Sequence, residues 1–245
     1  MAKAGNFDWS IINRPLIVDI IKLAGANTIN TPLSTLEFTK EVRQLLRLFK
    51  IPVSVRTCYN KITTKNHVWV GGLYNSADDK KSKKSIIVEL QFHNKDDIIT
   101  ISKNKFNRIC YSVADTVLHE IIHLRQYRRR NFKFIPGYDS VASSSKQRTE
   151  QIYLGHNDEI DAYSFNIACQ LLDRFKNDRS RIVNYLNNNL NDKRKKKDCY
   201  KMYLEVFDHD HDHNVIKKLK KKIINYMPNA LEIKKPYKTS DWLKK

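Results

Sequence analysis

The chain lacks any long apolar run. No stretch of about eighteen apolar residues occurs in its 245 residues, which excludes an ordinary transmembrane helix. The N-terminal stretch MAKAGNFDWSIINRP also has no continuous apolar segment ending in small residues, as a secretory signal would. We therefore expect an intracellular, cytoplasmic protein without a membrane segment.

Cysteine is scarce and scattered. The four cysteines, Cys58, Cys110, Cys169 and Cys199, form no CxxC pair. This spacing favours neither a cysteine-ligated zinc site, such as a zinc ribbon, nor a disulfide framework. A reducing compartment is the simpler expectation.

The composition is otherwise that of a folded protein. Hydrophobic residues make up 41% and aromatic residues 10%, well above the content of a disordered chain. The length allows one large domain, or one domain with an appendage. We expect one domain over residues 1–176 and a basic, Lys/Asn-rich helical extension over residues 177–245.

The formal net charge of +19 is the strongest compositional signal. Such a charge attracts polyanions, so nucleic acid or an acidic protein is a plausible partner. A chain that is simply rich in Lys, Asn and Ile, as products of AT-rich genomes are, would show the same excess. The basic clusters would form one polyanion-binding surface only if they converge in space; they are residues 80–84, 128–130, 193–197 and 217–222.

The first half of the chain reads as a helix followed by a small sheet. Ser34 precedes Glu37 by three residues, as in a capping box, and apolar residues then recur at helical spacing to Phe49. Short β-rich runs follow, namely IPVSVRTCY, HVWVGGLY, SIIVELQF and DIITIS. These runs predict a small, mainly antiparallel sheet.

The period changes to that of a helix over residues 107–130, which contain the motif HEIIH. His119 and His123 lie four residues apart, so both imidazoles can reach one cation from adjacent turns. Glu120 would lie beside that cation, where it can take a proton from an attacking water. The motif predicts a Zn²⁺ site and metal-assisted hydrolysis with Glu120 as general base.

A zinc site of this kind needs a third protein ligand. After a long loop, the segment DEIDAYSFNIACQLLDRF predicts a second helix, and Glu159 lies in its first turn. Ala162 follows one turn later on the same face and would allow close helix packing. Glu159 is our predicted ligand; Asp158, Asp161 and His156 compete for the position.

The pairing of HEIIH with the helix EIDAYSFNIACQLL resembles the zincin metallopeptidase superfamily, in its gluzincin type, and is similar to ImmA/IrrE-like peptidases. The resemblance spans roughly residues 30–175 and rests on two short motifs. It implies an α+β zincin-like core with an edge strand beside the cleft, to which an extended peptide could add. The long loop, Tyr163 and the basic C-terminal third depart from the family pattern.

Neighbouring polar residues have two interpretations each. Asp115 lies one turn before His119 and either orients an imidazole or is a solvated carboxylate. His156, Tyr153 or Tyr163 could stabilise a tetrahedral intermediate, whereas the tyrosines could equally pack in the core. Residues 128–130 directly follow the metal helix, so they could form a basic rim that favours acidic substrates or DNA-associated proteins.

The segment DHDHDHN, residues 208–214, alternates histidine with aspartate, a composition that can bind metal. A loop between two basic helices would have the same composition. We therefore retain both interpretations.

Two functions are compatible with these features. The first is a zinc peptidase that acts on a protein or peptide substrate. The second is a catalytically weak or inactive zincin-fold protein that acts as a basic nucleic-acid-associated or virion component, for example in a phage particle. Both would hold for a protease that acts on DNA-attached proteins, as SprT-like proteases do.

Overall fold

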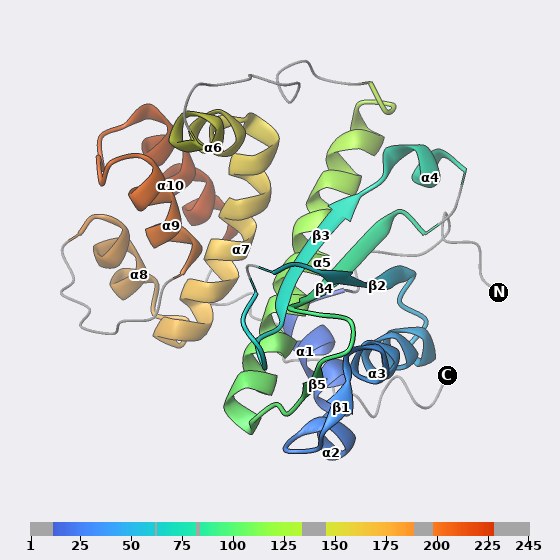
Figure 1. Ribbon diagram of the computed structural model, residues 1–245. Helices are drawn as coiled ribbons and strands as arrows, with labels where there is room; N and C mark the ends of the chain where they lie inside the picture. The colour runs from blue at the N-terminus through green and yellow to red at the C-terminus, as the bar shows by residue number, and fades with distance from the viewer. Residues whose placement is uncertain (1–11, 62, 82–83, 134–145, 189–197, 228–245) are drawn as a thin grey trace. The chain divides into compact units, whose positions relative to one another are not determined.

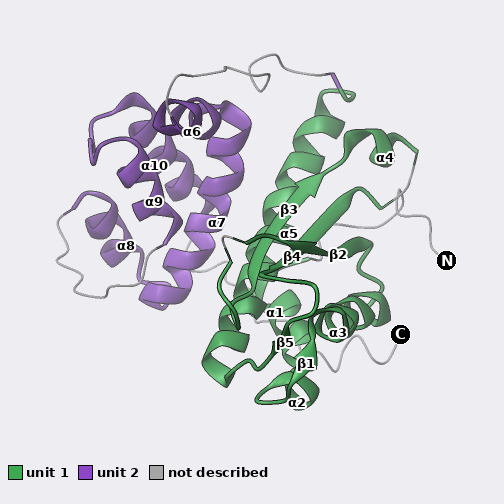
Figure 2. Ribbon diagram, in the orientation of Figure 1, with its two compact units in different colours: residues 1–132, 235–245 green, residues 133–234 purple. Residues whose placement is uncertain are grey.

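The computed structural model describes residues 12–61, 63–81, 84–133, 146–188 and 198–227. The chain forms two compact units, one of residues 1–132 and 235–245 and one of residues 133–234 (Figure 2). The architecture is α+β, with many helices and a small sheet (Figure 1). In the described residues, none of the helices is both long and apolar enough to cross a membrane.

The first unit contains all the strands of the described chain. Its elements, in chain order, are α1 (Arg14–Lys22), α2 (Gly25–Thr28), β1 (Leu33–Ser34), α3 (Thr35–Leu48), β2 (Val53–Tyr59), β3 (Trp69–Tyr74), α4 (Ser76–Lys80), β4 (Ile86–Phe92), β5 (Ile98–Ile99) and α5 (Lys103–Arg129).

Helix α3 begins at the predicted capping box. The Ser34 hydroxyl accepts a hydrogen bond from the Glu37 amide at 3.2 Å, and the Ser34 amide donates to Glu37 Oε2 at 2.8 Å. These bonds satisfy amide groups that the first helical turn leaves without backbone partners. The helix buries Phe38, Val42 and Leu46, which recur every four residues along one face.

The main sheet has the strand order β2-β4-β3. Strand β3 runs antiparallel to β4, whereas β2 runs parallel to it. Strands β2 and β3 thus form the two sides of a wide hairpin, and β4 inserts between them. The predicted antiparallel pairing holds for β3–β4 and for the short β1–β5 ribbon, while β2–β4 makes the sheet mixed.

One face of this sheet packs on helices. In β4 the side chains of Ile86, Val88, Leu90 and Phe92 are buried and alternate with partly exposed ones, as a strand with one core face requires. Phe92 meets Phe38 of α3 edge to face, with ring centroids 6.2 Å apart. The long helix α5 lies along β3 and β4 on this buried face.

The second unit is entirely helical in its described residues. Its elements are α6 (Lys146–Gly155), α7 (Asn157–Phe175), α8 (Arg179–Leu186), α9 (Cys199–Val206) and α10 (Asn214–Tyr226). One apolar core joins α7 to α8, α9 and α10, and it includes Leu171, Phe175, Tyr200, Tyr203 and Leu219.

The units divide at a different place from the boundary expected after residue 176. Helix α7 shares its core with the helices of the C-terminal extension, so the compact unit begins after Phe132. The Phe175 ring, for instance, lies 5.5 Å from the Tyr185 ring of α8. In the described residues, the change of composition near residue 177 therefore falls within one shared core.

Candidate metal centre

Helix α5 presents the two histidines of the HEIIH motif on one face. The Nε2 atoms of His119 and His123 lie 3.1 Å apart, and both side chains are buried. Their rings meet nearly edge to face, with centroids 4.8 Å apart. The spacing of four residues places one ring a turn above the other, as the sequence predicts.

Gln126 fixes the orientation of the second histidine. Its side-chain Oε1 lies 2.9 Å from Nδ1 of His123, and the pair is buried. Because a carbonyl oxygen only accepts, Nδ1 of His123 carries the hydrogen and donates it. The lone pair of a neutral His123 is then on Nε2, the atom that faces His119.

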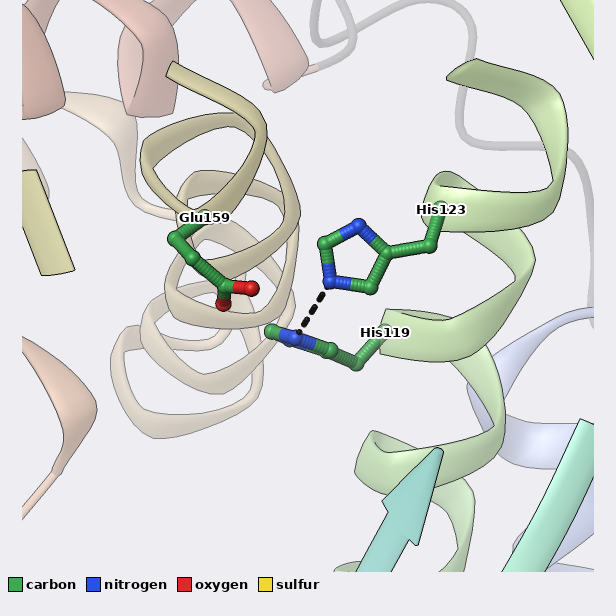
Figure 3. A group of neighbouring side chains, drawn as sticks. All are labelled: His119, His123 and Glu159. Atoms are coloured by element: carbon green, nitrogen blue, oxygen red, sulfur yellow. Dashed lines mark hydrogen bonds between the residues drawn. The ribbon is translucent and has the colours of Figure 1, made fainter. Parts of the chain in front are cut away.

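Glu159 completes the group that the sequence predicts. One ligand atom from each of His119, His123 and Glu159 lies within 4.8 Å of the others, and all three residues are buried (Figure 3). Glu159 is 2% exposed, in the first turn of α7. Among the described residues, this is the one set of three or more potential ligands that could hold a metal ion.

Two of the three competitors for the third position, His156 and Asp161, make other contacts. His156 is the N-cap of α7, where its Nδ1 accepts a hydrogen bond from the Asp158 amide at 3.2 Å. Asp161 forms an ion pair with Lys222 at 2.5 Å and accepts a hydrogen bond from the Tyr226 hydroxyl at 2.9 Å. These contacts tie α7 to α10 and to its own N-terminus.

The donor set fits a divalent cation. Tetrahedral zinc with ligands at about 2.0–2.1 Å requires neighbouring donors about 3.3–3.4 Å apart, close to the observed Nε2 separation. Two buried Nε2 atoms that face each other also need a shared proton or a cation to offset the repulsion of their lone pairs. Two imidazoles and one carboxylate leave a fourth position open, as hydrolytic zinc sites do.

Glu120 lies between the histidines in sequence and close to strand β3 in space. It is buried, and a methyl group placed on Gly72 would lie 3.2 Å from its Oε1 and 2.4 Å from Cγ2 of Thr116. Glycine at this position therefore lets the β3 backbone approach the carboxylate. Gly72 is not among the site residues that the motifs predict, although a glycine pair inside a strand often marks such a close approach.

Asp115 has a role that neither interpretation of it anticipated. Its carboxylate accepts hydrogen bonds from Nε and Nη2 of Arg14, at 2.6 and 3.2 Å. Both side chains are largely buried. The pair joins α1 to α5 across 101 residues of sequence. The solvated interpretation of Asp115 is therefore wrong.

Arg128, the first residue of the basic triplet 128–130, forms an ion pair with Asp79. Arg128 donates two hydrogen bonds to the Asp79 carboxylate, at 2.8 and 2.6 Å, and Tyr74 donates a third at 2.9 Å. The Asp79 side chain is 2% exposed. Burial, and then the adjacent Asp79 carboxylate, raise the pKa of Tyr74 above its ordinary value.

The candidate tyrosines separate into two kinds. Tyr163 packs edge to face on Tyr203 with ring centroids 5.5 Å apart, which agrees with the interpretation of core packing. Tyr203 is buried and donates its hydroxyl to the Leu154 carbonyl at 3.1 Å. Tyr153 is exposed at the surface of α6.

The DHDHDH segment forms the connection between α9 and α10. His213 is the N-cap of α10 and accepts from the Val215 amide at 3.2 Å, while Asp210 accepts from the Asp212 amide at 2.8 Å. Asp208 and His209 adopt left-handed backbone conformations. These are turn and capping contacts, and they favour the interpretation as a connecting loop.

In comparisons with protein-family models, with curated proteins and with solved structures, nothing matches this chain.

Proposed function

We propose that the protein is a zinc-dependent peptidase with His119, His123 and Glu159 as metal ligands and Glu120 as general base. The observation that carries this proposal is the convergence of both Nε2 atoms with the Glu159 carboxylate in a buried group. The mixed nitrogen and oxygen donors, and a coordination number that leaves one position open, are those of hydrolytic zinc sites.

The chemistry divides between the ion and the chain. A bound zinc ion would supply Lewis-acid polarisation of the scissile carbonyl. Glu120 follows His119 directly, so its carboxylate lies next to the ligand group; there it would accept a proton from the attacking water and then deliver it to the leaving amine. Its burial would favour this proton transfer, because surrounding water would otherwise compete for the carboxylate.

Strand β3 offers a binding edge for an extended substrate. Among the described strands it pairs with β4 alone, so its other edge can accept a further strand. Gly72 places this strand beside Glu120. Peptide addition along β3 would therefore bring a main-chain amide bond near the general base, which favours peptide bonds as the substrate class.

The proposal is tested by cleavage of an unfolded protein such as casein, in zinc-containing buffer and after treatment with a chelator. We expect cleavage by the wild type, recovery of activity when zinc is restored, and a loss of at least about 100-fold in Glu120→Gln. His67→Ala is the matched control, because His67 is exposed and lies outside the ligand group. Equal cleavage by the wild type and Glu120→Gln would overturn the proposal.

A further inference from the structure

Two segments that are distant in sequence meet at one end of the main sheet. Helix α3 ends at Leu48, shortly before β2 begins at Val53, and Val53 pairs with Ile86 at the start of β4. Ile86 also pairs with Tyr74, the last residue of β3, from which the chain continues into α4. The end of α3 and the α4 connection therefore lie at the same end of the sheet.

The C-terminal end of α5 reaches this place as well. Arg128 of α5 pairs with Asp79 of α4, and the Tyr127 ring lies 5.3 Å from the Tyr74 ring. The Lys80 ammonium lies 5.4 Å from the centre of the Phe132 ring, just beyond the helix. Figure 1 shows α4 beside this end of α5.

These segments carry many cations and few acids. Within residues 47–53, 74–86 and 125–132 the acidic residues are Asp78 and Asp79, and Arg128 neutralises Asp79. The exposed cations gathered here, which we call the basic end surface, are Arg47, Lys50, Lys80, Lys81, Lys84 and Arg129.

Two cations of this surface, Arg47 and Lys84, come from different elements and lie close together. Partial burial, and then the positive charge of Arg47, lower the pKa of Lys84. Arg47 belongs to α3, while Lys84 belongs to the connection between α4 and β4. The two sequence clusters 80–84 and 128–130 thus converge with the end of α3 on one surface.

Helix α10 differs from this surface although it carries a similar lysine run. Lys217 pairs with Asp212 at 3.3 Å, and Lys222 pairs with Asp161 at 2.5 Å. Lys218 donates a hydrogen bond to the side chain of Asn157. Two lysines of α10 are therefore neutralised by carboxylates of their own unit. The cluster 193–197 lies outside the described residues.

We propose that the basic end surface binds the phosphate backbone of nucleic acid without reading base sequence. Several adjacent Lys and Arg side chains can neutralise consecutive phosphates and release their counterions. An acidic protein is a poorer fit, because protein interfaces are anchored by aromatic and apolar side chains. Among the described residues of these segments, Leu48 is the one large apolar side chain that is exposed.

The test measures binding of a short, labelled DNA duplex by fluorescence anisotropy over a range of salt concentrations. The surface variant is Lys80→Gln/Lys81→Gln/Lys84→Gln. The control variant is Lys217→Gln/Lys218→Gln/Lys221→Gln, which removes the same charge from exposed positions on α10. Unchanged melting temperatures show that both variants fold.

We expect the surface variant to bind DNA at least on the order of tenfold more weakly than the wild type. The slope of log K against log salt should become less negative by roughly 2 to 3, because about that many phosphate contacts are lost. The control variant keeps most of the wild-type affinity, and two duplexes of different sequence bind equally. Absence of binding, or equal losses in the two variants, would overturn the proposal. Binding of polyglutamate as tight as that of DNA would assign the surface to acidic proteins instead.

Discussion

Gly72 of β3 and Glu120 of α5 are so close that a methyl group on the glycine would lie 3.2 Å from the Glu120 carboxylate. The same methyl would lie 2.4 Å from Thr116 Cγ2 and 3.1 Å from the Ile87 carbonyl oxygen. Strand and helix can therefore pack in this way only when residue 72 has no side chain. This contact sets the distance between the proposed substrate edge and the proposed general base.

Gly72→Ala should destabilise the protein by about 1–3 kcal/mol, because the added methyl overpacks the β3–α5 contact. It should also lower kcat/KM for peptide cleavage, since β3 must move away from Glu120. Urea unfolding and steady-state kinetics measure the two effects.

Gly71→Ala is the matched control for this substitution. Its methyl would meet the ends of the flexible Gln91 and Glu89 side chains, at 3.3 and 4.0 Å. We expect a change in stability within about 0.5 to 1 kcal/mol, the range of a tolerated substitution. If Gly71→Ala and Gly72→Ala were equally harmful, the close approach of β3 to α5 would not be the cause.

Gln126→Met should weaken zinc binding about 10- to 100-fold, because it removes the acceptor that fixes Nδ1–H of His123. Gln126→Glu keeps an acceptor at the same place and should retain most of the affinity. Competition with a chromophoric chelator measures the dissociation constant of each variant. If a folded Gln126→Met protein bound zinc as tightly as the wild type, zinc binding by His123 would not depend on Gln126.

Stability should fall as the pH rises above about 10, the ordinary pKa of tyrosine. Burial is the largest cause of a raised pKa at Tyr74, Tyr185, Tyr200 and Tyr203. Above that pH the unfolded chain loses these protons while the folded chain keeps them. The folded state then binds more protons, so the free energy of unfolding decreases as pH increases.

Urea unfolding at about pH 8 and about pH 11 tests this expectation, with absorbance at the tyrosinate band as a direct readout of ionisation. Tyr200→Phe should reduce the loss of stability between the two pH values, because it removes one of the raised groups. An equal loss in Tyr200→Phe and the wild type would exclude Tyr200 as a contributor.

Local signals in the sequence account for much of the site. The capping box places the start of α3, and the helical period places His119 and His123 on one face of α5. The helical pattern of DEIDAYSFNIACQLLDRF places Glu159 in the first turn of α7, and the need for a third ligand selects it. The place of each residue on its own helix depends on neighbours within a few positions, which is the range over which sequence patterns are informative. The meeting of Glu159 with the two histidines is a contact between distant segments.

Contacts between distant residues were not predictable in the same way. Asp115 pairs with Arg14 and Arg128 pairs with Asp79, and neither partner is marked by any local pattern. The division of the chain after Phe132 likewise depends on which helices share a core with α7. Such features are set by tertiary packing, so they require the fold.

The metal content of the purified protein tests the central claim most directly, measured by elemental mass spectrometry on the wild type, His123→Ala, Glu159→Ala and the control His67→Ala. We predict about one zinc per chain in the wild type and in His67→Ala, as expected for a single three-ligand site, and its loss in the other two variants. If the wild type contained no zinc after purification with zinc present, the account would be contradicted. Zinc retained in Glu159→Ala would remove Glu159 from the ligand set.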